Sequence, residues 1–383
     1  MSALRNYYFT STAEISYPCV WMVLAAILSQ NVALSSWDTA LPFDVNAAST
    51  IRRFSRWLHN DKIDTAQIYD AIIRDALRNW GGERITLALD TTMLRENIYA
   101  VRVSIIYLGR AIPLAWSVLE HKSSSVKFEK YKDVLAQARS RLPENLKVIF
   151  LADRGFVSKA LMCQLNKWGW IWRIRIKNNQ VLYCGDKRMT PKMLKLKKGN
   201  AMLFSGNIRF AKTLRALSLS AGWSQHAKEP WYILSNTEAS SENFMEYGLR
   251  FDIEEEFKDE KSGGFSLEKS RLAGTEALER LILVIAVATI ITVNEGLAVT
   301  AAGDRKKVDG HWERGLSYIQ IGWRWILKQC RRALVTWSCR LELVAMSEPL
   351  PVAPTRKASA LRRKRKIPKF HFKSIIPCSH LHF

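Results

Sequence analysis

The chain turns to strand-like sequence at Ile85-Thr86-Leu87-Ala88-Leu89-Asp90-Thr91, a mostly apolar run that carries one carboxylate close to its end. Two further strand-like runs, Val101–Leu108 and Ile112–Leu119, follow on either side of Gly109, which is typical of a β-hairpin. The sequence therefore predicts three consecutive strands, with Asp90 near the end of the first.

Alternating helices and strands continue this pattern along the chain. The next four predicted elements are a helix, a buried strand, a helix and a strand, at Val126–Arg141, Lys147–Ala152, Ser158–Trp168 and Ile171–Ile176. The order β-β-β-α-β-α-β is that of an α/β, RNase H-like fold, in which the first and fourth strands are neighbours in a mixed sheet. Because Asp153 directly follows the fourth strand, we expect Asp90 and Asp153 to face each other across adjacent strands.

Composition and periodicity divide the chain into five regions. Residues 1–80 are predicted to be a helical N-terminal region, and residues 81–176 the first part of the RNase H-like core. Residues 177–236 are basic and rich in short strand-like runs, so we interpret them as an inserted β-rich subdomain. Residues 237–345 complete the core and add apolar helices, and residues 346–383 have the composition of a basic, disordered tail.

The net charge of +23 on 383 residues is concentrated in two segments. Residues 171–230 carry a net +11 and residues 351–383 a net +9, so most of the excess lies there. A protein this basic usually binds a polyanion, and the concentration favours nucleic acid over a membrane surface. In the N-terminal region, Arg52, Arg53 and Arg56 share one predicted helix, either as an ordinary solvated face or as a DNA contact.

Cysteine usage and apolar runs indicate a cytoplasmic protein. The six cysteines form no CxxC pair and no Cys/His cluster, which argues against a zinc site and for a reducing compartment. Two apolar runs, Leu281–Val293 and Val20–Leu28, are shorter than the ~20 residues that span a bilayer, so we interpret both as core helices. We therefore expect no membrane partner.

A further group of candidate site residues lies on one predicted helix. Helical spacing places five residues on one narrow face, namely Tyr247, Arg250, Glu254, Phe257 and Lys261. A helix made only to pack would fill that face with aliphatic side chains, whereas alternating charges favour a phosphate backbone or a metal ion as partner. The simpler alternative is an Arg250–Glu254 ion pair within the helix, which contributes only about 0.3–0.5 kcal/mol.

The same face resembles a known family. Tyr247-x2-Arg250-x3-Glu254-x6-Lys261 matches the Tyr–Arg–Glu–Lys signature of the IS-four family of bacterial insertion-sequence transposases. Phe251 departs from the family pattern, in which a tryptophan commonly follows the arginine. The departure keeps apolar bulk but removes an indole N–H donor.

Two other segments agree with this resemblance. Leu87–Thr92 resembles the strand that carries the family's first catalytic aspartate, and Ala152–Phe156 resembles the segment that carries the second. The resemblance implies that Asp90, Asp153 and Glu254 form the acidic triad of a DDE recombinase.

Carboxylates in this combination suit metal-dependent phosphodiester cleavage. Two divalent ions neutralise charge on the phosphoryl group and activate a water or hydroxyl, and Mg²⁺, with Mn²⁺ as a substitute, prefers carboxylate ligands. Asp90 would bridge both ions, with Asp153 on one and Glu254 on the other. Taken singly, the two aspartates could also be ordinary turn residues, and Glu254 could belong to a solvated helix face.

DNA contacts follow from the resemblance as well. It implies that Tyr247, Arg250 and Lys261 contact phosphates beside the scissile bond, and we add Arg154, which follows the second aspartate, to this set. In some relatives a tryptophan at the place of Trp231 stacks on a flipped base, and an ordinary core tryptophan is the alternative that stays open.

The resemblance thus implies a cut-and-paste DNA transposase. It would bind the terminal inverted repeats of its element as a homodimer in the bacterial nucleoid, cut each end through a DNA hairpin and join the ends to target DNA. Three alternatives stay open: a repurposed or inactive DNA-binding protein, a nuclease that cuts without joining, and an RNA-processing RNase H. The chain contains neither GxxxxGK[ST] nor GxSxG, so nucleotide hydrolysis and serine esterase chemistry have no support.

Overall fold

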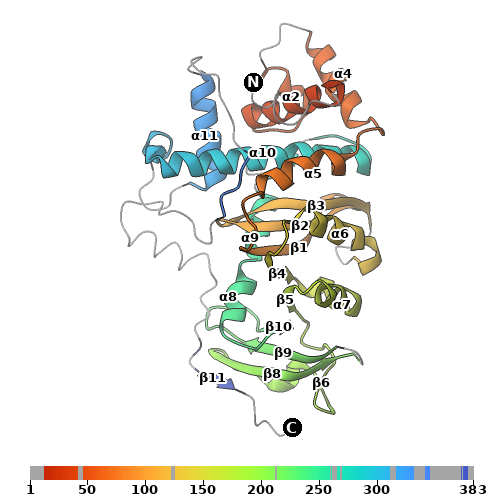
Figure 1. Ribbon diagram of the computed structural model, residues 1–383, viewed down its shortest axis with the longest axis vertical. Coiled ribbons are helices and arrows are strands. Elements are labelled where there is room, and N and C mark those ends of the chain that lie inside the picture. Colours follow the sequence, from red (N-terminus) through yellow and green to blue (C-terminus); the bar gives the residue numbers. More distant parts are fainter. Residues whose placement is uncertain are drawn as a thin grey trace.

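One long sheet runs through the molecule, with helices on both of its faces and a helical layer at one end (Figure 1). The structure is a computed structural model of the chain. It describes residues 13–41, 46–121, 126–211, 214–258, 260, 265–267, 270–310, 316–331, 341–345, 372 and 374–377.

The sheet contains eleven strands from the described residues. They are β1 (Arg84–Arg95), β2 (Ile98–Tyr107), β3 (Arg110–Glu120), β4 (Lys147–Ala152), β5 (Ile171–Arg175), β6 (Leu182–Cys184), β7 (Lys187–Met189), β8 (Asn200–Phe210), β9 (Leu214–Gly222), β10 (Trp231–Ser235) and β11 (Ser374–Pro377). Their order is β3-β2-β1-β4-β5-β10-β9-β8-β6-β7, with β11 beside β8. β1 pairs antiparallel with β2 and parallel with β4, and β4 pairs parallel with β5, so the sheet is mixed.

The predicted RNase H-like order is confirmed. β2 and β3 form the expected hairpin, and its two-residue turn at Leu108 and Gly109 has positive φ at both positions, which is typical of the tight turns that match the strand twist. The helix α6 (Lys132–Arg141) joins β3 to β4, and α7 (Lys159–Lys167) joins β4 to β5. The first of these helices begins later than predicted, because a short 3₁₀ turn at Phe128–Lys130 precedes it.

Two pairs of helices flank the sheet. α6 packs on β3 and β2, and α7 packs on β5. α8 (Glu242–Gly248) and α9 (Phe251–Lys258) lie on the other side of the sheet in Figure 1, where α9 packs on β1, β2 and β3. The α9 side is where the candidate site forms.

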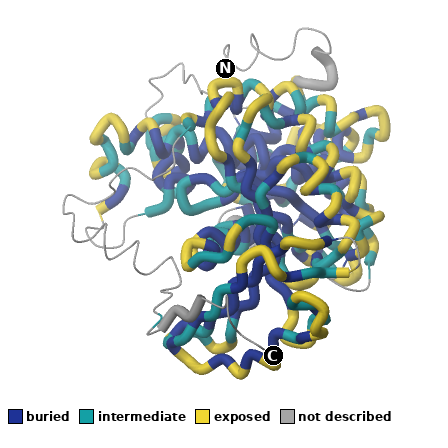
Figure 2. The backbone as a smooth tube through the Cα atoms, turned by 60° about the horizontal axis from the view of Figure 1, so that its bottom comes forward, coloured by how far each residue is buried: buried dark blue, intermediate teal, exposed yellow. Residues whose placement is uncertain are grey.

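A helical layer covers the β3 end of the sheet. Its helices are α2 (Ala13–Ser29), α3 (Leu34–Trp37), α4 (Ala47–Leu58), α5 (Thr65–Ala76), α10 (Thr275–Ala301) and α11 (Tyr318–Arg331). α10 is long and apolar enough to cross a membrane, but most of it is buried inside the protein. The two apolar runs of α10 and α2 are therefore core helices, as predicted, and Figure 2 shows buried backbone through the centre of the molecule.

The basic region 177–236 is joined to the core through backbone pairing. β10 pairs antiparallel with β5, and β9, β8, β6 and β7 extend the same sheet outward. Of the tail 346–383, the structure describes Phe372 and Ser374–Pro377, where β11 runs parallel to β8. The predicted disorder of the rest of the tail concerns residues outside the described part of the chain.

Candidate active site

Asp90 and Asp153 lie at the same end of two neighbouring parallel strands. Leu89 of β1 is opposite Ala152 of β4, and each aspartate is the next residue along its chain. Parallel strands bring their carboxyl ends to one edge of a sheet. The structure thus brings the two predicted carboxylates together.

Strand alternation decides which face these carboxylates share. Ala88 and Leu151, two residues before each aspartate, pack in a small apolar cluster with Ile253 of α9. Since side chains alternate along a strand, Asp90 leaves β1 on the same face, and Asp153 follows Leu151 toward it. Both carboxylates therefore lie on the face of the sheet that carries α8 and α9, and not on the face of the main core.

The signature residues complete the site from α8 and α9. Arg250 Nη1 donates to Asp90 Oδ2 at 2.6 Å, and its Nη2 donates to Glu254 Oε1 at 2.8 Å. The hydroxyl of Tyr247 donates to Asp153 Oδ1 at 3.2 Å. The three predicted carboxylates are thus connected through one buried arginine, whose side chain is 5% exposed, and one buried tyrosine.

The single helix predicted for the signature is instead two helices. α8 ends at Gly248, and the backbone N–H groups of Leu249 and Arg250 bond to carbonyls three residues back, at 3.1 and 3.0 Å. Glycine is a weak helix former, and these tight turns let the chain re-enter the helix as α9. Tyr247 and Arg250 still face the acidic site, Tyr247 at Asp153 and Arg250 at Asp90, whereas Lys261 lies outside the described residues.

Burial sets the electrostatics of the first aspartate. It raises the pKa of Asp90 to about 6, a stronger effect than the opposing influence of Arg250 and of the Thr91 N–H, which donates to Asp90 at 2.8 Å. The nearby carboxylates of Asp153 and Glu254 raise this pKa further. The site therefore concentrates negative charge that needs a cation.

In this structure the guanidinium of Arg250 supplies the positive charge that the carboxylates need. Burial alone lowers its pKa, but Tyr247 and the acidic groups around it raise the pKa overall, so the guanidinium keeps its charge. Among the residues that the structure describes, its Nε is buried and has no hydrogen-bond partner. Arg250 therefore compensates the carboxylates without being fully satisfied itself.

The donor set fits a hard divalent ion. Carboxylate oxygens from Asp90, Asp153 and Glu254 are the ligand type that Mg²⁺ prefers. Within the described residues no three acidic, histidine or cysteine side chains are yet gathered closely enough to ligate one ion, since Arg250 lies between two of the carboxylates. A metal would therefore take over the charge compensation that Arg250 now provides.

Trp231 is packed as a core residue in this structure. Its ring stacks on Phe251 with centroids 5.7 Å apart and planes 25° apart, and meets the Tyr247 ring edge-on at 5.1 Å. Arg175 lies over the same ring, with its guanidinium carbon 5.6 Å from the centroid. Stacking on a base would require one of these neighbours to move.

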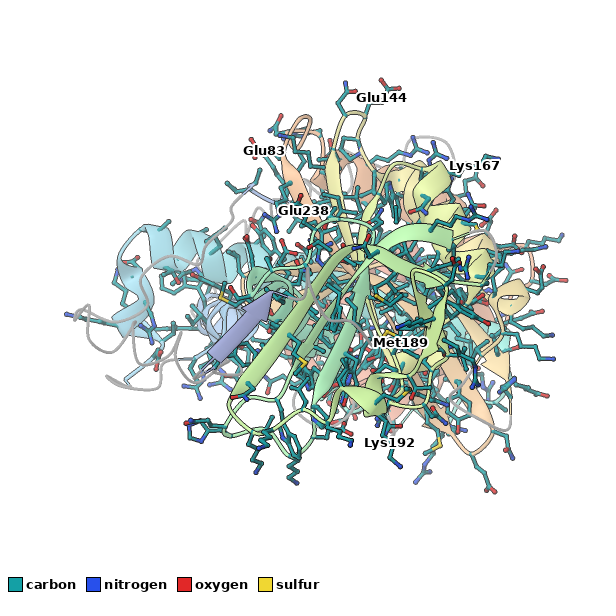
Figure 3. The ribbon with its side chains drawn as sticks, turned by 90° about the horizontal axis from the view of Figure 1, so that it is seen from below. Glu83, Glu144, Lys167, Met189, Lys192 and Glu238 are labelled. Atoms are coloured by element: carbon teal, nitrogen blue, oxygen red, sulfur yellow. The ribbon has the colours of Figure 1, made fainter. Side chains whose placement is uncertain are left out.

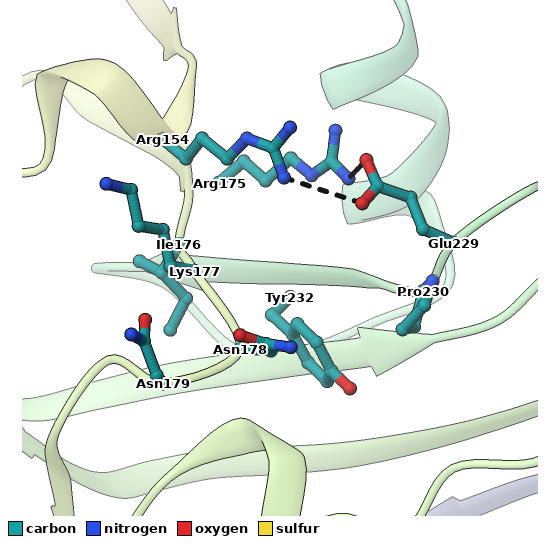
Figure 4. Close-up of a pocket in the computed structure, with 9 residues that line it drawn as sticks. All are labelled: Arg154, Arg175, Ile176, Lys177, Asn178, Asn179, Glu229, Pro230 and Tyr232. Atoms are coloured by element: carbon teal, nitrogen blue, oxygen red, sulfur yellow. Dashed lines mark hydrogen bonds and ion pairs between the residues drawn. The ribbon is translucent and has the colours of Figure 1, made fainter. Parts of the chain in front are cut away.

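Arg154 was predicted as a DNA contact, but several other charged residues near the site were not predicted. Arg175 and Arg154 both contact Glu229, which lies just before β10 (Figure 4). Glu246 of α8 accepts from Arg173 at 2.9 Å and also from Arg84, which fixes α8 to the sheet. One hint of these contacts is present in the sequence. Arg173 and Arg175 stand at alternate positions of one predicted strand, a pattern that is common in basic proteins.

A comparison with protein families shows where the chain belongs. The sequence model of the family described as "Transposase DDE domain" matches residues 83–291, more than half of the chain, and this range contains all three carboxylates. Among solved structures, the chain is similar to the cryo-EM structure of the piggyBac transposase synaptic complex with hairpin DNA. That likeness has 12% identity and a TM-score of 0.45 over 92% of this chain and 81% of that one, which is too distant to support a functional argument. No curated protein matches the chain.

Proposed function

Because the chain belongs to the family of transposase DDE domains, we propose that it is an IS-four-type transposase that cuts and joins DNA with Asp90, Asp153 and Glu254. The observation that carries this proposal is the pair of contacts from Arg250 to Asp90 and Glu254, together with the contact of Tyr247 to Asp153. These contacts join three carboxylates, far apart in sequence, into one site.

Members of this family generally use divalent metal ions, and the three carboxylates would hold two Mg²⁺ ions, or Mn²⁺ in their place. When bound, the ions neutralise charge on the phosphoryl group and activate a water or a 3′-OH. Arg250, once released from the carboxylates, would donate both Nη groups to a phosphate of the DNA. Tyr247 would orient Asp153 through its hydroxyl, and Lys261 would add a phosphate contact on the strength of the signature alone.

The partner that we propose is double-stranded DNA, both the inverted-repeat ends of the element and its target. Phosphate contacts by lysine and arginine supply most non-specific affinity for DNA. The side chains of Arg52, Arg53 and Arg56 are exposed on α4, and that of Arg154 is exposed beside the site. We propose a homodimer on DNA, in the cytoplasm and at the nucleoid, with hairpin ends as intermediates.

A joining assay separates this function from its alternatives. The purified protein is mixed with Mg²⁺, a supercoiled target plasmid and a duplex that carries one flanking inverted repeat with a free 3′-OH. We expect covalently joined products from the wild type and none from Glu254→Gln. Glu238→Gln removes the same charge from an exposed position outside the site and should join normally.

Cleavage of the repeat without any joining would indicate a nuclease of the same fold. Binding of the repeat without cleavage or joining would indicate a DNA-binding protein that has lost its chemistry. Either result would contradict the proposed function.

A further inference from the structure

A pocket of about 330 Å³ opens next to the proposed catalytic carboxylates. Arg154, which follows Asp153 in the chain, lines it together with Arg175. Arg175 also lies over the ring of Trp231, which contacts Tyr247, the residue bound to Asp153. Two side chains, Trp231 and Tyr247, therefore connect Arg175 of the pocket to Asp153 of the acidic site.

The lining of this pocket is suited to an anion. It has three cations, Arg154, Arg175 and Lys177, against one carboxylate, Glu229. Asn178 and Asn179 add further polar groups on the wall opposite Glu229 (Figure 4). Arginine is favoured where proteins recognise phosphate, because its planar donors match the phosphate oxygens.

Glu229 occupies both arginines in this structure. Its Oε1 accepts from Arg175 Nη2 at 2.5 Å, and its Oε2 accepts from Arg154 Nη1 at 3.4 Å (Figure 4). Arg175 is largely buried, with 10% of its side chain exposed, whereas 51% of the Glu229 side chain is exposed. A half-exposed carboxylate contributes little net energy to such a pair and can exchange with another anion.

We propose that this pocket binds a backbone phosphate of the DNA strand that enters the active site, and that Glu229 is a built-in competitor which the phosphate displaces. The inference rests on the proposed function and adds a regulating residue to the same site. Glu229 would lower the affinity for DNA whose phosphate enters the pocket, because that phosphate must first displace the carboxylate from the two arginines.

A path for the strand continues beyond the pocket. The backbone N–H of Lys192 donates to the carbonyl of Asn178 in the pocket wall at 2.9 Å. Figure 3 shows Lys192 at the rim opposite Glu83 and Glu144, which lie where β1 and β4 begin. Exposed cations follow one another in this segment, namely Lys187, Arg188, Lys192, Lys195, Lys197 and Lys198. A strand that leaves the pocket on this side would meet positive charge.

The test is equilibrium binding of Glu229→Gln to a fluorescent duplex of the flanking inverted repeat, in EDTA to prevent cleavage and over a range of KCl. We expect about 3- to 10-fold tighter binding than wild type, since the phosphate no longer competes with a carboxylate. The plot of log K against log[KCl] should also steepen by about one, because the freed arginines now release counterions on binding.

Glu238→Gln is the matched control. It removes one negative charge from an exposed residue that Figure 3 places away from Lys192, so it reports the effect of net charge alone. In an Arg154→Gln background, the gain from Glu229→Gln should shrink, because the two residues share one contact.

Equal affinity and equal salt dependence for Glu229→Gln and Glu238→Gln would overturn the inference while leaving the proposed function intact. Failure of every protein, wild type included, to bind the duplex would overturn the proposed function and this inference with it.

Discussion

Arg250 holds the site together at the scale of single residues. Its two Nη groups bind carboxylates that come from β1 and from α9, and almost none of the arginine is exposed. Removing one partner of such a buried cluster leaves charge uncompensated, which typically costs about 3–5 kcal/mol. The residue that the signature assigns to DNA therefore also compensates the charge of two carboxylates in this structure.

This dual role predicts competition between Arg250 and metal. Arg250→Gln should bind Mn²⁺ at least about tenfold more tightly than wild type in titration calorimetry without DNA, because the ion no longer has to displace a guanidinium from Asp90 and Glu254. The same variant should be less stable than wild type in EDTA, and Mn²⁺ should restore much of that loss.

Arg154→Gln is the control, since this exposed arginine pairs with Glu229, which is not one of the three carboxylates. Weaker Mn²⁺ binding by Arg250→Gln than by Arg154→Gln would show that the guanidinium supports the metal site and does not compete with it.

Residue types and spacing were sufficient to place Asp90 and Asp153 together and to suggest the Arg250–Glu254 pair, but not to find the contacts of the surrounding arginines. Asp90 and Asp153 could be placed because strand ends in a known order converge. Arg175 and Glu229 could not, because their contact depends on the pairing of β5 with β10 and on the loop before β10, which periodicity does not determine.

At the scale of elements, the sequence predicted whether a segment is a helix or a strand better than it predicted where that element begins and ends. Apolar periodicity identified β1 to β5 and their connecting helices, since each element buries one face in the core. The signature helix was predicted as one piece, whereas Gly248 and two tight turns divide it. The extension of the sheet through β10 was not predicted, because strand pairing between distant segments leaves no local pattern.

The crossing of α10 and α11 yields a prediction at this scale. A Cβ on Gly322 would lie 1.9 Å from the Thr292 carbonyl oxygen, and one on Gly296 would lie 1.9 Å from that of Tyr318. Gly322→Ala should therefore lower the free energy of unfolding by about 3 kcal/mol or more, as measured by thermal or denaturant melting.

Gly81→Ala is the comparison, because a Cβ there meets nothing within 4 Å. Equal melting temperatures for the two variants would mean that α10 and α11 do not cross as closely as described.

At the scale of the whole molecule, one sheet carries both the acidic site and the basic surface beside it. Its β1–β4 junction carries the carboxylates, and its β5–β10 junction carries the arginine pocket. The basic strands beyond that junction extend the same surface away from the helical layer (Figure 1). DNA that lies along the sheet could therefore contact the cationic segment while one of its phosphates reaches Asp90 and Asp153.

The central claim is that Asp90, Asp153 and Glu254 cut DNA with metal ions. The most direct measurement is cleavage of a supercoiled plasmid that carries the gene with its own flanking DNA, in Mg²⁺ or in EDTA, by wild type and by Glu254→Ala. We expect metal-dependent cuts at the element ends by wild type, and no cuts by a Glu254→Ala protein that still binds those ends. Cuts that persist in Glu254→Ala, or binding without cuts by the wild type, would contradict this claim.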